Sequence, residues 1–111
     1  MQFALYGVVI GSLVIAGCAT TSDPETLGTL KNPVKVRMPL GERAYLDRLR
    51  CPDGAPPSYN RQGSGGPAAD GHIVDFYEVI CQGRGKVIII MDMYHGNLEN
   101  RPVPGFTIVP G

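Results

Sequence analysis

The chain has 111 residues, 43% of them hydrophobic, and its formal net charge is zero. This length leaves room for one globular domain and excludes a chain of several domains. The charge is unevenly distributed, because all ten acidic and all ten basic residues lie at or after Asp23. The sequence therefore consists of an uncharged N-terminal piece followed by a charged remainder.

The uncharged piece has the pattern of a secretory signal peptide. Such a peptide needs an apolar stretch of about 7 to 15 residues, followed by small residues at the cleavage site. Residues 3–17 supply this stretch, and Ala16 and Gly17 supply the small residues. We therefore expect residues 1–17 to form a signal peptide, in which the amino group of Met1 is the only positive charge before the apolar stretch.

The end of this stretch, Ile15-Ala16-Gly17-Cys18, resembles the lipobox of bacterial lipoproteins. The resemblance implies cleavage before Cys18, transfer of a diacylglyceryl group to its sulfur and, usually, a third acyl chain on its amino group. Two or more acyl chains anchor a protein stably without a transmembrane helix. No aspartate follows Cys18, and the resemblance therefore also implies passage to the outer membrane. We expect a lipid-anchored protein of the cell membrane or outer membrane, with its domain facing the periplasm.

An uncleaved N-terminal anchor is the alternative interpretation, because about 20 apolar residues span a bilayer and the uncharged run is nearly that long. It is less favoured, because Gly7, Gly11 and Gly17 lower the helix propensity of the run.

The residues that follow are polar and low in bulky side chains. They predict a lipidated N-terminus and flexible tether over 18–32 and a single globular domain over 33–111.

Two further cysteines, Cys51 and Cys81, remain once Cys18 is assigned to lipid. An even pair in an exported chain favours a disulfide, because the compartment is oxidising. The bridge would close a loop of about 30 residues and contribute roughly 3 to 4 kcal/mol on the chain-entropy model. Two free thiols or a metal site are the alternatives, but the sequence lacks the C-x-x-C spacing that indicates zinc.

The first part of the domain predicts one strand and one helix. Residues 34–38 alternate apolar and basic side chains, with the period of a half-buried strand. Residues 42–50 bring Tyr45, Leu46 and Leu49 together at helical spacing, with an acid in the first turn and arginines in the last. We expect a short helix that ends before the proline that follows.

A loop and a hairpin follow. Residues 52–71 contain five glycines and four prolines, which predict an irregular excursion without a strand. Two strand candidates come next, at about 72–81 and 86–95, joined by a loop over 82–85 that contains two glycines. The second strand is apolar on both faces over 87–91, so it should be central in its sheet and covered.

The fold class expected from these elements is α+β, a small antiparallel sheet built on the central hairpin with one short helix. Candidate neighbours of the hairpin are the strand near 34–38 and a terminal strand at 106–109.

A symmetric register for the hairpin brings polar residues together at its open end. It places Asp75 opposite Asp92 on one face and His72 opposite His95 on the other. Two opposed carboxylates could share a proton, bind a cation or act as an acid and base pair. Asp70, His72 and His95 resemble, in residue type, a site of two histidines and one carboxylate, which suits transition metals. The alternative is a set of solvated polar residues with no ligand.

Four short segments resemble the conserved part of uncharacterised small proteobacterial lipoproteins, a family to which no activity is attached. The resemblance covers about the last 60 residues and is carried by Cys51-Pro-Asp-Gly54, Asp70-Gly-His-Ile73, Asp92-Met-Tyr-His95 and Pro102-Val-Pro-Gly-Phe106.

We therefore expect a membrane-anchored lipoprotein of the cell envelope with a structural or protein-interaction role. The membrane is its partner through lipid on Cys18, and another envelope protein is the candidate second partner. We expect no enzyme activity, no cofactor and no nucleic-acid partner. The first alternative is a small periplasmic ligand- or metal-binding module, with Asp70, His72 and His95 as the candidate metal ligands. The second is a hydrolase that uses the polar residues of the hairpin.

Overall fold

The computed structural model describes residues 23–96 and 98–111 of the chain. The predicted signal peptide and Cys18 lie outside the described residues. Within them, four strands form one mixed sheet in the order β2-β6-β5-β4. These strands are β2 (Val34–Lys35), β4 (Ser58–Gly65), β5 (Val74–Cys81) and β6 (Gly85–Asp92). The predicted α+β class is confirmed, but the sheet is mixed rather than antiparallel, because β2 runs parallel to β6.

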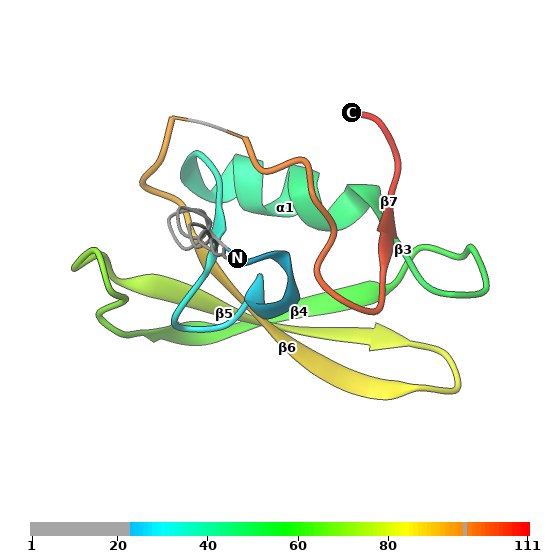
Figure 1. Ribbon diagram of the computed structural model, residues 1–111. Coiled ribbons are helices and arrows are strands. Elements are labelled where there is room, and N and C mark those ends of the chain that lie inside the picture. Colours follow the sequence, from blue (N-terminus) through cyan, green and yellow to red (C-terminus); the bar gives the residue numbers. More distant parts are fainter. Residues whose placement is uncertain (1–22, 97) are drawn as a thin grey trace, which may run out of the picture.

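Helix α1 (Met38–Arg48) packs on one face of this sheet (Figure 1). Its buried side chains are Glu42, Tyr45 and Leu46, which lie at the spacing expected for one face of a helix. The helix begins at Met38, four residues earlier than predicted. A proline in the first helical turn is favourable, since the N–H that it lacks has no partner there.

The core lies between α1 and the sheet, and alternate residues of the two hairpin strands form its sheet side together with residues of β2. On β5 these residues include Tyr77, Val79 and Cys81, and on β6 they are Ile89 and Met91. The opposite face of β6 is more open, since Ile88 is 47% exposed. The expected central position of β6 is therefore confirmed, but the strand is covered on only one of its two faces along most of its length.

The irregular excursion predicted over 52–71 is wrong in its middle, because β4 is an eight-residue strand there. It pairs antiparallel with β5, with a register shift between Arg61 and Gly63. The strand is polar and mostly exposed, so the apolar alternation that identifies a strand in a sequence is missing. The strand is stabilised by its pairing with β5 and by the edge-to-face contact between the rings of Tyr59 and Tyr77.

The hairpin of β5 and β6 is confirmed, but its register differs by one residue from the symmetric one. Cys81 pairs with Gly85, so that the turn contains three residues instead of four. Gly83 and Gly85 both have positive φ, which glycine adopts without strain and which closes a three-residue hairpin turn. Because side chains alternate along a strand, this shift moves every residue of β6 relative to its predicted partner.

The folded domain begins earlier than predicted. Residues 23–32, expected to be a flexible tether, form the short 3-10 helix η3 (Pro24–Thr26) and a turn that packs on the core. Leu27 is buried in that core, and the carbonyl of Gly28 accepts a hydrogen bond from the backbone N–H of Ile90. A single buried leucine in a polar stretch is too weak a periodic signal to reveal this docking.

The C-terminal strand does not join the main sheet as expected. Strand β7 (Thr107–Ile108) pairs instead with β3 (Leu49–Arg50), at the end of α1. The predicted disulfide between Cys51 and Cys81 is present and joins the residue after β3 to the end of β5. The helix, residues 23–32 and the C-terminal segment all lie on the same side of the main sheet (Figure 1).

Candidate metal centre

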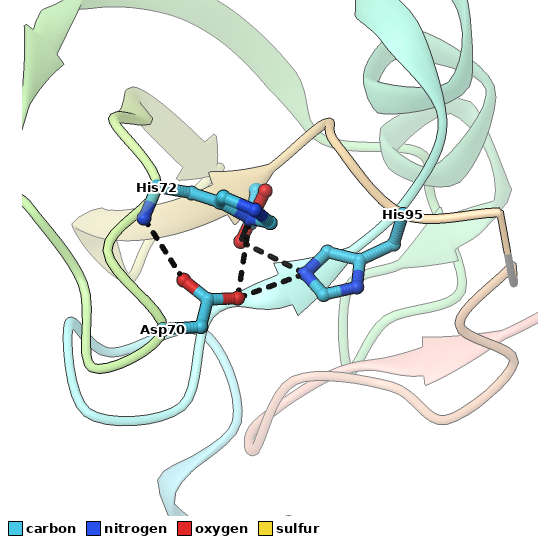
Figure 2. A group of neighbouring side chains, drawn as sticks. Asp70, His72 and His95 are labelled. Atoms are coloured by element: carbon cyan, nitrogen blue, oxygen red, sulfur yellow. Dashed lines mark hydrogen bonds and ion pairs between the residues drawn. The ribbon is translucent and has the colours of Figure 1, made fainter.

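Four polar side chains meet at the end of the sheet away from the disulfide. Asp70 and His72 lie in the connection that precedes β5, Asp92 is the last residue of β6, and His95 follows three residues later. The antiparallel pairing of Asp75 with Met91 brings the start of β5 beside the end of β6. Figure 2 shows Asp70, His72 and His95 pointing toward one another from these separate segments.

Asp92 is the buried member of the cluster, with a side chain only 1% exposed. Its Oδ2 atom lies 2.8 Å from Nδ1 of His72 and 2.9 Å from Nε2 of His95. Its Oδ1 atom accepts a hydrogen bond from the backbone N–H of Tyr94 at 3.0 Å. The carboxylate is therefore fixed by the backbone on one side and directs a single oxygen toward both imidazoles.

Asp70 repeats this arrangement from the solvent side. Its Oδ2 atom lies 3.2 Å from Nδ1 of His72 and 3.1 Å from Nε2 of His95. Its Oδ1 atom accepts a hydrogen bond from the backbone N–H of His72 at 3.1 Å. Each imidazole nitrogen thus lies between two carboxylate oxygens, in an alternating ring of four donor atoms.

The pKa values of Asp92 and His72 are both shifted in the direction that favours the charged form. Burial alone would raise the pKa of Asp92, but hydrogen bonds from Tyr94 and from the two imidazoles outweigh it, so that the pKa is lowered. The pKa of His72 is raised, mainly by its hydrogen bond to Asp92. Without a metal ion, contacts between the imidazole nitrogens and the carboxylate oxygens hold the cluster together.

Aromatic contacts fix the imidazole rings from the side. The rings of His72 and His95 meet edge to face, with centroids 5.1 Å apart. The ring of Tyr94 makes a similar contact with His72 at 5.5 Å and is half exposed. These contacts limit ring rotation and keep the nitrogens directed at the carboxylates.

This set of donors matches the chemistry of a metal site. One atom from each residue can be chosen so that the four atoms all lie within 4.8 Å of one another. Imidazole nitrogen and carboxylate oxygen together suit zinc, copper, nickel and non-haem iron. Among the residues that the structure describes, this is the one group of three or more such side chains with metal-binding geometry.

The sequence predicted the three residues Asp70, His72 and His95 as neighbours, and the structure brings them together. It did not place Asp92 with them, because the symmetric register put that residue on the opposite face. The shorter turn reverses this assignment, and Asp92 becomes the central residue of the cluster. The turn glycines were the signal that could have revealed the correct register.

Asp75, the predicted partner of Asp92, lies instead on the core face of β5. Its carboxylate accepts a hydrogen bond from Arg61 at 2.9 Å and lies close to the carboxyl group of Glu42. Glu42 is fully buried and accepts a hydrogen bond from the hydroxyl of Tyr77 at 3.1 Å. Burial, and then the neighbouring Asp75, raise the pKa of Glu42 to about 8. The opposed aspartate pair predicted from the sequence is therefore wrong.

No family model, curated protein or solved structure matches this chain. No helix within the described ranges is both long and apolar enough to cross a bilayer. The described residues also form no pocket. The cluster of Asp70, His72, Asp92 and His95 lies at the surface of the described part of the chain rather than in a cleft.

Proposed function

We propose that this protein is a lipid-anchored component of the bacterial cell envelope whose domain binds one divalent transition-metal ion. Asp70, His72, Asp92 and His95 would hold the ion. The observation that carries the proposal is the convergence of two imidazole nitrogens and two carboxylate oxygens around the buried side chain of Asp92.

The spacing of the donors supports this assignment. Neighbouring donor atoms in the ring are 2.8 to 3.2 Å apart. Ligand atoms bound tetrahedrally to zinc at about 2.0 to 2.2 Å are separated from one another by about 3.3 to 3.6 Å. An ion can therefore enter the centre with small shifts of the side chains, after the imidazole nitrogens have lost their protons.

The charge of the four side chains also supports the binding of a divalent cation. Two carboxylates and two neutral imidazoles carry a net charge of about minus two, which a divalent cation neutralises. The hydrogen bonds from the backbone of Tyr94 and His72 already orient both carboxylates. Such outer-shell contacts position the ligands and increase metal affinity.

Calorimetric titration of the full-length protein with zinc, nickel and copper tests the proposal. We expect one ion per chain for at least one of these metals, with affinity lost in the variant His72→Gln/His95→Gln. Asp53→Asn is a matched control, because Asp53 is exposed and lies in the turn after Cys51, where asparagine can keep the hydrogen bond to Ala55. The absence of stoichiometric binding of all three metals at neutral pH would overturn the metal function.

The proposed location in the cell envelope has separate support in the lipobox-like residues 15–18. Intact mass measurement of the native protein tests it: we expect a chain that begins at Cys18 and carries fatty acid. The variant Cys18→Ser should lack the acyl mass and leave the membrane fraction. A native protein with an uncleaved N-terminus and no acyl groups would contradict the location in the envelope. It would not bear on the proposed metal binding. The structural or protein-interaction role expected from the sequence stays a prediction.

A further inference from the structure

Each carboxylate of the metal centre directs one oxygen, Oδ2, toward the two imidazoles. In Asp92 the other oxygen is held by the N–H of Tyr94, and in Asp70 it is held by the N–H of His72. Each imidazole also offers one nitrogen. The four side chains thus direct four donor atoms at the centre, whereas copper, nickel and cobalt commonly take five or six and even zinc can expand to five.

The four donors are also unequally placed with respect to solvent. The side chain of Asp92 is 1% exposed and forms the floor of the centre, whereas those of His95, His72 and Asp70 are 25%, 36% and 37% exposed. The protein thus surrounds the ion from below and from the sides. The outward side is the exposed one, because Asp70 and His72 are each more than a third exposed and the described residues enclose no pocket there.

From this asymmetry we propose that the bound ion keeps an open coordination position, which takes a monodentate nitrogen or oxygen donor from outside the chain. This inference rests on the proposed metal function and defines the class of ligand, an imidazole or a small anion. Zinc held by four protein ligands would take an external ligand only by expanding to five-coordination, whereas an ion that takes five or six donors would keep a position open beside the four protein ligands.

The surface around the open position is accessible to a donor that belongs to a larger molecule. Tyr94 stands beside His72 with its ring half exposed, and the centre is not recessed in a cleft. A histidine side chain on a peptide can therefore approach the ion as closely as free imidazole can. The two sources share the same chemistry and are separated by the experiment.

Cobalt(II) is the probe metal, since its visible absorption reports both coordination number and donor type. The full-length protein is loaded with cobalt and titrated with azide, with imidazole and with a short peptide that contains one histidine. We expect the cobalt bands to shift in a saturable way with azide and imidazole while equilibrium dialysis shows the metal retained. A similar shift with the peptide extends the ligand class to protein side chains, and its absence restricts the class to small molecules. Either outcome supports the open position.

The variant Asp70→Ala provides an internal comparison, because it removes the most exposed donor and leaves the buried floor of Asp92 in place. We expect it to bind cobalt more weakly and to show a larger azide-induced shift than the wild type. Unchanged cobalt bands at saturating azide and imidazole, with the metal still bound, would overturn the open position alone. Failure to develop any cobalt bands, together with no binding of zinc, nickel or copper in the calorimetric titration, would instead overturn the proposed metal function.

Discussion

Oδ2 of Asp92 lies 2.8 Å from Nδ1 of His72, although the two residues are 20 positions apart in the chain. The contact exists because a three-residue turn sets the register of β5 and β6, and because the connection before β5 folds back over the end of β6. A buried carboxylate is thereby placed against an imidazole that extends toward solvent. The chemistry of the whole centre depends on this pair.

Replacing Asp92 by asparagine should weaken metal binding more than any other conservative change in the centre. The amide keeps the size of the side chain but removes the buried negative charge that neutralises the ion. Loss of an outer-shell contact typically costs about 10- to 100-fold in metal affinity, and loss of a direct ligand should cost at least 100-fold. Titration of Asp92→Asn beside the control Asp53→Asn measures the difference. Equal affinities in these two variants would show that Asp92 is not a ligand.

Metal binding should also stabilise the folded domain. A ligand that binds only the native state adds about 2.7 kcal/mol at a free concentration 100 times its dissociation constant. Thermal unfolding with and without excess zinc, and after addition of a chelator, should show a higher midpoint with metal in the wild type. The variant His95→Gln should show little change. A metal-dependent midpoint of the same size in that variant would place the ion elsewhere.

The buried carboxyl of Glu42 should make stability fall as the pH rises. Its pKa is about 8 in the fold and 4.5 in a solvated chain, so that the native state binds more protons between these values. Stability is therefore greatest below about pH 4.5 as far as this group is concerned, and declines through pH 8, with a total change on the order of 2 kcal/mol or more.

Urea unfolding at several pH values between 5 and 9 measures this contribution. We expect Glu42→Gln to flatten the decline, because its amide cannot ionise. Glu25→Gln is the control, since Glu25 is exposed and should leave the profile unchanged. A wild-type profile that rises from pH 5 to pH 8, with no difference between the two variants, would contradict the assignment.

The disulfide should account for a large part of the stability of this small domain. Opening the bridge between Cys51 and Cys81, whose sequence separation is 30, should cost roughly 3 to 4 kcal/mol. Urea unfolding of the variant Cys51→Ser/Cys81→Ser measures the loss, and Cys18→Ser serves as the control for cysteine substitution. If the double variant unfolds at the same urea concentration as this control, the bridge contributes nothing to the native state.

The elements with strong periodic patterns could be predicted from the sequence. The apolar alternation of β5 and the apolar run of β6 revealed the hairpin, and the spacing of Tyr45, Leu46 and Leu49 revealed the helix. The pairing of Cys51 with Cys81 followed from their number and from the expectation of an exported chain. Each of these signals is local or arises from a simple count, so that no knowledge of the tertiary structure was needed.

The features that were missed depend on tertiary contacts. Strand β4 is polar, and it is ordered by hydrogen bonds to β5 that its own sequence does not indicate. Docking of residues 23–32 rests on one buried leucine and on the backbone hydrogen bond from Ile90 to Gly28. Asp92 was assigned to the wrong face because a turn shorter by one residue exchanges the faces of a strand. The candidate site was therefore predicted in three of its residues and missed in the one that organises it.

A crystal structure of the zinc-loaded protein, with anomalous diffraction measured at the zinc absorption edge, tests the central claim most directly. We expect a single anomalous peak about 2.0 to 2.2 Å from Oδ2 of Asp70 and Asp92, Nδ1 of His72 and Nε2 of His95. A peak at another location, or the same four side chains paired with one another and no zinc between them, would contradict it.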